Sequence, residues 1–337
     1  MLHELKEIVR HAKIARKQGI KLVFVSVVAL EGSSYRRPGV RMLVMENGAM
    51  VGAVSGGCVE KEVVHQAQSV FEDGTPKVMV YDGRYRLGCE GILHILIEPF
   101  EPNDSFFEAF ERQQSLRKAF TIESQFSKSE ENKRVGGSRF IFSDGTVVPM
   151  MGYHTEAHEM TVFSQQISAG FRLLIIGCEH DAVQLSHFAS LTGWEVTVIA
   201  PPDEVKSIDN FPGATAYWPM SQTDLESLEI DMHTAVVVMT HSYAKDLKYL
   251  SALRDKELTY LGLLGPSKRK EKLLNQLMEL YPDMDGSFFD TISGPSGINI
   301  GAETPQEIVI SILAEILAVV RKQQPMPLKD KKGGIHQ

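Results

Sequence analysis

The stretch FRLLIIGCEHDAVQLSHFASLTGWEVTVIA, residues 171–200, decides the fold of the second half of the chain. FRLLIIG is a continuous apolar run, typical of a strand that is buried on both faces of a parallel sheet. DAVQLSHFASLTG has the composition and length of a helix, and WEVTVIA is a second apolar strand. A strand, a helix and another strand in this order predict a parallel β-α-β unit.

The same alternation continues toward the C-terminus. Apolar runs at 234–241 and 258–265 predict further strands, and helices are predicted at 243–255, 266–280 and 304–323. We therefore expect a Rossmann-like, doubly wound parallel-sheet domain of the α/β class over residues 171–324. The polar residues 325–337 are expected to form a flexible tail.

Residues 1–152 predict an α+β domain instead. An amphipathic helix over about 2–18 precedes a strand at 21–30, and a hairpin then turns at Asn47 and Gly48, a pair that tolerates positive φ angles. Further strands at 77–82 and 92–99 and a helix at 104–117 follow. Residues 153–170 lose this periodicity and are interpreted as a linker between the two domains.

Two motifs in the first half carry chemistry: GSSYRRPGVRM at 32–42 and VSGGCVEKE at 54–62. The hairpin between them would bring the arginine loop back toward Cys58. Cys58 opens a segment with helical spacing, and the positive end of a helix dipole favours the thiolate. We expect backbone N–H groups of Ser55, Gly56, Gly57 and Cys58 to bind an anion.

Arginine side chains would complete this site, because guanidinium groups suit phosphate and oxyanions; the candidates are Arg36, Arg37 and Arg41. Each of these residues also has an interpretation that involves no ligand. The thiol of Cys58 is either a reactive ligand or a small packing group, and Cys89 alone favours a structural role. Arg36 and Arg37 either contact a ligand or lie in solvent.

A dinucleotide fingerprint is damaged in the second half. Its turn has the sequence Gly177, Cys178, Glu179, His180, so that a carboxylate replaces the second glycine, beside which a pyrophosphate would bind. The next strand ends in Ala200 and two prolines instead of the acid that binds ribose. We therefore do not expect NAD(P) to bind in the usual geometry.

His241 ends another strand at the edge where open α/β sheets bind ligands. It is either a ligand contact or proton carrier, or a histidine that bonds to its own loop.

The composition of the chain argues against some classes of binding partner. The 337-residue chain has a formal net charge of −8, which argues against binding to nucleic acid or to anionic membranes. No run approaches the roughly 20 apolar residues of a membrane helix. Three widely spaced cysteines do not form a disulfide framework, so we expect a cytoplasmic protein.

The motifs GSSYRRPG, SGGCVE and LGCEG resemble those of the XdhC/CoxI family of accessory proteins for molybdenum hydroxylases. MTHSYAKDL, YLGLLGPSKRKEKLL and GINIGAETPQEIVISILAEIL resemble the Rossmann-like domain of the same family, so the resemblance covers nearly the whole chain. One departure is Glu179, where the family pattern often has glycine before His180.

The resemblance implies a chaperone that binds the molybdenum cofactor (molybdopterin) transiently and loads it into xanthine dehydrogenase or a related hydroxylase, without turnover of its own. On this hypothesis Cys58 contacts the metal, with Cys89 as a second thiol, and the arginine loop and Ser55, Gly56 and Gly57 hold anionic groups. His241, from its place at a strand end, is a further candidate contact. The implied partners are the hydroxylase, proteins of cofactor biosynthesis or sulfuration, and a second copy of the chain in a homodimer. Two rival functions are an NAD(P)-dependent oxidoreductase and a non-catalytic docking partner of a hydroxylase.

Overall fold

The computed structural model describes residues 2–32, 37–83, 91–128, 135–151 and 160–332. The chain forms two compact units, Met1–Ala169 and Gly170–Gln337. In the described part, no helix is both long and apolar enough to cross a membrane.

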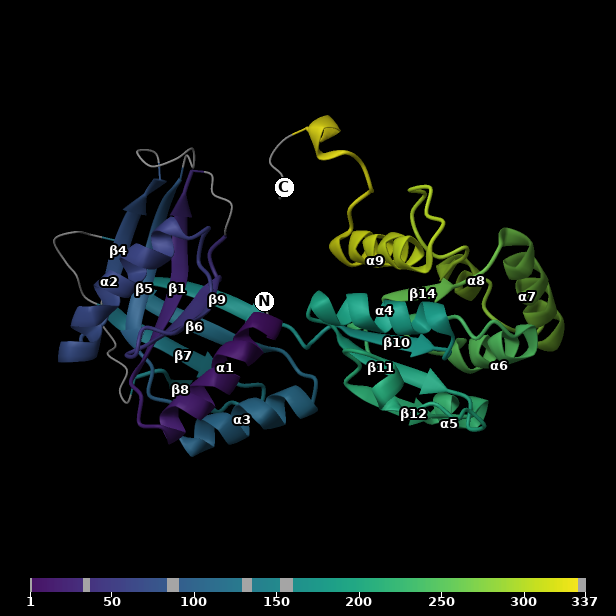
Figure 1. Cartoon of the computed structure of the whole chain (residues 1–337), viewed down its shortest axis with the longest axis horizontal. Coiled ribbons are helices and arrows are strands. Elements are labelled where there is room, and N and C mark those ends of the chain that lie inside the picture. The colour runs from purple at the N-terminus through teal and green to yellow at the C-terminus, as the bar shows by residue number, and fades with distance from the viewer. Residues whose placement is uncertain (1, 33–36, 84–90, 129–134, 152–159, 333–337) are drawn as a thin grey trace. The chain divides into compact units, whose positions relative to one another are not determined.

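The described residues of the first unit form two antiparallel sheets and three α-helices (Figure 1). One sheet has the strand order β3-β2-β1-β5-β4, made of β1 (Leu22–Glu31), β2 (Arg41–Met45), β3 (Met50–Gly52), β4 (Lys77–Asp82) and β5 (Ile92–Pro99). The other has the order β8-β7-β6-β9, made of β6 (Phe120–Phe126), β7 (Val135–Ile141), β8 (Val147–Pro149) and β9 (Thr161–Ile167). The helices are α1 (Leu2–Lys17), α2 (Cys58–Asp73) and α3 (Asp104–Ser115).

Successive side chains of β1 point to opposite faces of the first sheet, and both faces are buried. Val23, Val25 and Val27 pack in one cluster with the apolar stripe of α2. Phe24, on the opposite face, belongs to a cluster that includes residues of α1, α3 and the second sheet. This second cluster is rich in aromatic rings. Some of them pack edge to face, such as Phe106 and Phe140, whose ring centroids are 4.8 Å apart. Helix α2 is thus fixed on one side of the sheet, and the second sheet lies on the other.

The predicted hairpin is confirmed, and the predicted linker is wrong for part of its length. β2 and β3 pair antiparallel around the turn at Asn47 and Gly48. Residues 161–167, expected in the linker, form β9, which pairs with β6 along its whole length. Strand β9 is mostly exposed, so its sequence lacks the apolar alternation that identifies half-buried strands.

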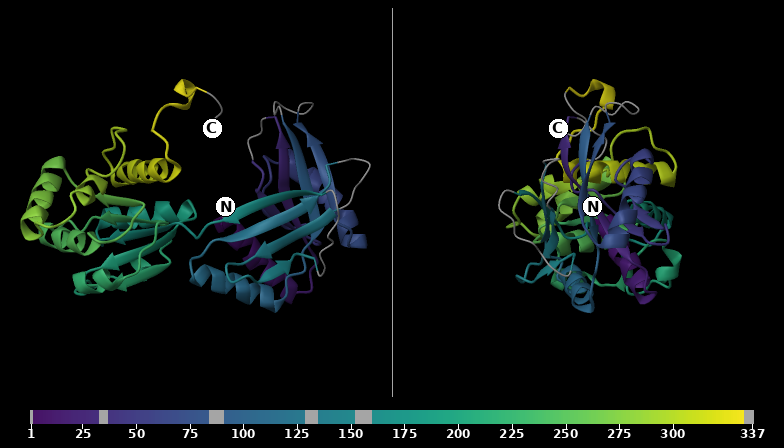
Figure 2. Two further views of the ribbon diagram at one scale, coloured as in Figure 1. Left: turned by 180° about the vertical axis from the view of Figure 1, so that it is seen from behind. Right: turned by 90° about the vertical axis from the view of Figure 1, so that its left-hand side faces the viewer.

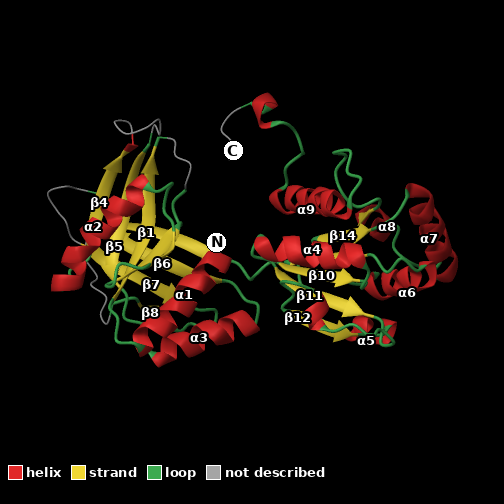
Figure 3. Cartoon of the chain, in the orientation of Figure 1, coloured by secondary structure: helices red, strands yellow, loops and turns green. Residues whose placement is uncertain are grey.

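The second unit is a parallel sheet with the order β12-β11-β10-β13-β14-β15, which confirms the Rossmann-like prediction (Figures 2 and 3). Its strands are β10 (Arg172–Ile176), β11 (Glu195–Ala200), β12 (Ala216–Pro219), β13 (Thr234–Val238), β14 (Tyr260–Leu263) and β15 (Ile292–Ser293). Its α-helices are α4 (His180–Leu191), α5 (Gln222–Ser227), α6 (Tyr243–Leu253), α7 (Ser267–Leu280), α8 (Ser287–Thr291) and α9 (Pro305–Arg321), and two short 3-10 helices are η2 (Ile208–Asn210) and η3 (Leu328–Asp330).

Helices cover both faces of this sheet. α4 and α9 pack together on one face, whereas α5, α6 and α7 contribute to the cluster on the other. Gly177, directly after β10, has φ 141°, and a Cβ there would collide with the carbonyl of Met239 at the end of β13. The first turn of the nucleotide-type fold is thus tightly packed against the neighbouring strand end, which requires glycine.

A carboxylate is buried between the two sheets of the first unit. Glu98 of β5 is fully buried and accepts hydrogen bonds from the amide (2.7 Å) and hydroxyl (2.5 Å) of Ser138 on β7. Desolvation raises the pKa of Glu98 to about 7, against the opposing effect of the Ser138 hydrogen bonds and the positive charge of Arg41.

This pKa predicts a stability that depends on pH. The unfolded chain releases the proton of Glu98 near pH 4.5 and the folded chain near pH 7, so folding is most favoured by this group below pH 4.5. Its contribution, up to about 3 kcal/mol, is lost as the pH rises through 7. Urea unfolding at several values from pH 5 to 8 should show a steeper fall for the wild type than for Glu98→Gln. Parallel curves for the two proteins would contradict the assigned pKa.

Candidate functional site

The SGGC motif forms a turn between β3 and α2. The hairpin delivers the chain to Ser55, Gly56 and Gly57, and α2 begins at Cys58, as predicted. Gly57 occupies the N-cap position with φ 110°, a value that strains any residue with a side chain. The glycine before the cysteine is therefore required by the backbone that starts the helix.

The carboxylate of Glu60 closes this turn. Its two oxygens accept hydrogen bonds from the amides of Ser55 and Gly57, both at 2.6 Å, and Glu60 is itself only 6% exposed. The prediction that these two N–H groups are free for an external anion is therefore wrong, because the protein supplies its own anion. The helix dipole favours a carboxylate at this place.

A pocket of about 620 Å³ lies against the turn. Its walls come from the end of the hairpin, the turn and the first two turns of α2, and its lining residues are Gly48, Met50, Gly52, Ala53, Ser55, Gly56, Gly57, Glu60, Lys61 and Val64. The volume is in the range of small-molecule and cofactor sites. Glycines form much of the wall, so a ligand can approach the backbone closely, and Lys61 supplies a positive charge.

The predicted arginine donors separate in the structure. Arg37 is exposed on the loop before β2, whereas Arg41 is only 6% exposed and points away from solvent. The expectation that Arg41 is a donor to a ligand in the same way as Arg37 is therefore wrong. Arg36, Cys89 and the side chain of Cys58 lie outside the described residues, so their predicted roles stay predictions.

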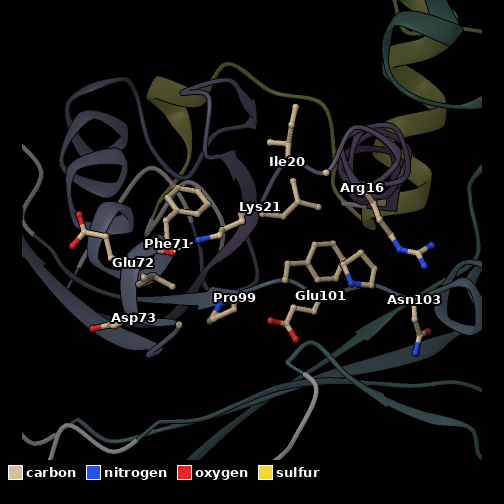
Figure 4. A pocket seen from close by; sticks show the side chains of 15 residues that line it. Arg16, Ile20, Lys21, Phe71, Glu72, Asp73, Pro99, Glu101 and Asn103 are labelled. Carbon is tan, nitrogen blue, oxygen red and sulfur yellow. Dashed lines mark hydrogen bonds between the residues drawn. The ribbon is translucent and has the colours of Figure 1, made fainter.

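A second pocket, of about 640 Å³, lies at the other end of α2 (Figure 4). Residues from the C-terminal turn of α2, the segment before β1 and the segment after β5 line it. Lys21 donates a hydrogen bond to the carbonyl of Phe71 (2.9 Å), which satisfies an acceptor in the last turn of α2. None of the predicted site residues lines this pocket, so the pocket at the SGGC turn is the better candidate.

His241 belongs to the second unit. It lies in the loop that follows β13, and its backbone has a positive φ of 57°. Its Nε2 lies 3.2 Å from a carboxylate oxygen of Asp181 in the first turn of α4. In a dinucleotide-binding protein the pyrophosphate occupies this helix start. Here Asp181 introduces a carboxylate, and Glu179 is the N-cap residue of the helix.

Other polar residues of this sheet edge have structural partners. Asp246 is 1% exposed and pairs with Arg269 at 2.6 Å, and Lys270 donates to the carbonyl of Ile292 at 2.7 Å. Arg269 and Lys270, which belong to the consecutive basic residues 268–270, therefore make contacts within the second unit. Burial raises the pKa of the Cys178 thiol to about 11, so it is an inert packing group.

The acceptor role of Glu60 in the site was not predicted from the sequence. Its position in the first helical turn indicated only a favourable interaction with the helix dipole. The available signal was the position of the acid three residues after the N-cap glycine, which is the second half of a capping box.

Comparisons with known proteins agree with the two motif regions. Residues 15–82 match the XdhC and CoxI family, and residues 173–316 match the XdhC Rossmann domain. Among curated proteins, the chain is 29% identical over 315 residues to a probable xanthine dehydrogenase subunit from Bacillus subtilis (strain 168), covering 88% of this chain and 92% of the relative. It is 25% identical over 324 residues to the molybdenum cofactor insertion chaperone PaoD of Escherichia coli (strain K12), covering 95% of this chain and 90% of the relative.

A solved structure has the same fold over most of the chain. The crystal structure of a xanthine dehydrogenase from Bacillus halodurans superposes with a TM-score of 0.77 and 27% sequence identity. The superposition covers 95% of this chain and 98% of that one.

Glu60→Ala tests the closed turn. Removal of the carboxylate leaves the amides of Ser55 and Gly57 without their acceptor, so we expect the free energy of unfolding to fall by about 1–3 kcal/mol. The control is Glu62→Ala, since Glu62 accepts a side-chain hydrogen bond from Gln66 on the same helix; its effect should stay below about 0.5 kcal/mol. Equal effects of the two substitutions in denaturant titrations would show that Glu60 does not hold the turn.

Proposed function

Because this chain belongs to the XdhC and CoxI family, we propose that it binds the molybdenum cofactor transiently and assists its loading into xanthine dehydrogenase or a related molybdenum hydroxylase in the cytoplasm. The observation that carries this proposal is the pocket between the hairpin and the start of α2, beside Cys58. It lies in the part of the chain that matches the family outside the Rossmann domain. The names of two relatives, one a cofactor insertion chaperone and the other a probable subunit of xanthine dehydrogenase, support the same role.

The chemistry of the pocket fits the cofactor, which is a pterin with a phosphate tail and a sulfur-bound, oxygen-rich molybdenum. Glycine walls and the side chains of Met50 and Val64 suit the flat pterin. A thiolate at the start of a helix suits a metal that prefers sulfur, and this is the role proposed for Cys58.

Cationic side chains are the proposed anion contacts. Two amides of the turn already bind Glu60, so the proposed cationic contacts of the cofactor are Lys61 at the pocket and Arg37 on the loop before β2. Arg36 and Cys89, which the family resemblance implicates, are proposed as additional contacts. His241 is proposed as a separate ligand contact of the second unit.

In this proposal the protein is a chaperone and not an enzyme with its own turnover. Its partners are the client hydroxylase, the proteins that make or sulfurate the cofactor, and a second copy of the chain in a homodimer. NAD(P) is not a proposed ligand, because Glu179 and Asp181 place carboxylates at the helix start where a pyrophosphate would bind.

Cofactor retention by purified variants tests the proposal. Wild-type protein from cells that make the cofactor should release molybdopterin, measured as its fluorescent oxidation product, whereas Cys58→Ser should retain at least about tenfold less. Cys178→Ala is the matched control, since it removes a buried thiol of the second unit and should retain as much as the wild type. Equal retention by all three would show that Cys58 does not bind the metal, and a wild type without pterin would refute the function.

A further inference from the structure

Arg41, at the start of β2, directs its charged group toward the loop that precedes it. Its Nη1 donates a hydrogen bond to the carbonyl of Gly39 (2.8 Å) and another to the side-chain oxygen of Gln165 on β9. Its cross-strand neighbour on β1 is Ser26, on the face that packs toward the second sheet. One guanidinium therefore connects the loop, the first sheet and the second sheet.

The loop stem at residues 37–40 is held on two sides. Gly39 donates to the carbonyl of Val27 (2.8 Å), Val27 donates to that of Val40 (3.0 Å), and Val40 donates to that of Arg37 (3.4 Å). On the other side Gln165 lies so close that a Cβ at Gly39, which has φ 97°, would collide with it. The stem is thus fixed between β1 and the Gln165 side chain, and Arg41 bonds to both the stem and Gln165.

The burial of Arg41 removes water from its cationic group, which is unfavourable for folding. Burial lowers the pKa of Arg41 to about 10, while the charge of Glu98 opposes this shift, so the guanidinium stays protonated at neutral pH. Within the described residues, Nε and Nη2 of Arg41 have no hydrogen-bond partner, and neither has the hydroxyl of Ser26. Since a buried cation with open hydrogen-bonding capacity does not favour folding, an apolar residue would serve the core better. The contribution particular to Arg41 is its bond to the loop stem.

We propose that Arg41 is a positioning residue, which holds the stem at 37–40 from inside the protein and so fixes the position of Arg37, the first residue of that stem. The effect of Arg41 on cofactor binding rests on the proposed function, because Arg37 is a proposed contact of the anionic cofactor. The effect of Arg41 on the stem itself does not depend on the identity of the ligand.

The double variant Arg41→Met/Glu98→Gln tests this inference in the full-length chain. It removes both buried charges together, so the fold is not left with one uncompensated charge. The matched control is Arg139→Met/Glu123→Gln, which removes a less buried ion pair (2.8 Å) between β7 and β6. Thermal unfolding, hydrogen exchange at the amides of Gly39 and Val40, and retention of molybdopterin are measured for both.

We expect the test variant to unfold cooperatively, to exchange the two stem amides at least about tenfold faster than the wild type, and to retain severalfold less cofactor. The control should change neither exchange nor retention. Unchanged exchange in the test variant would overturn the role of Arg41, and faster exchange with wild-type retention would overturn the link between the stem and the pocket. If the wild type itself retains no cofactor, the proposed function fails, while hydrogen exchange still decides whether Arg41 positions the stem.

Discussion

The hydrogen bonds from the amides of Ser55 and Gly57 to the carboxylate of Glu60 are the interaction on which the candidate site depends. They fix the turn between the hairpin and α2, and so they determine where the helix begins and where its first residue, Cys58, lies along the chain. The same turn forms one wall of the pocket. A carboxylate at this helix start also neutralises part of the positive end of the dipole, which reduces the stabilisation that remains for an external anion. In the proposed binding mode, lysine and arginine side chains therefore hold an anion more than backbone N–H groups do.

The two units of the chain differ in the charged groups that surround their candidate binding sites. In the second unit, the strand ends of the parallel sheet have the geometry of a nucleotide site, but Asp181 and His241 interact at the start of α4 and Asp246 binds Arg269. These polar groups pair with one another, so the proposed function assigns no nucleotide to this fold of the nucleotide-binding type. In the first unit, Lys61 lies in the wall of a pocket that is rich in glycine. The pocket lies within residues 15–82, which match the XdhC and CoxI family, whereas the second unit matches the XdhC Rossmann domain.

Periodicity in the sequence predicted most of the fold and identified the turn of the site. FRLLIIG and TAVVVMTH are apolar on both faces and lie at the centre of the parallel sheet, where burial leaves few alternatives. Strand β9 was missed because its sequence, TVFSQQI, alternates little and its side chains are mostly exposed. The inward orientation of Arg41 was also missed, because sequence alone gives a charged residue no reason to lie between two sheets. Gln165, its partner there, is 124 residues away in the chain, so no local pattern connects them.

The proposed binding place of the molybdenum cofactor is the pocket at the start of α2, in the first unit. Crystals of the full chain loaded with cofactor, with diffraction recorded on both sides of the molybdenum absorption edge, provide the direct measurement. Binding in this pocket gives an anomalous difference peak beside Gly57 and Lys61, which line it. A peak elsewhere in the chain, with none at this pocket, rules this binding place out.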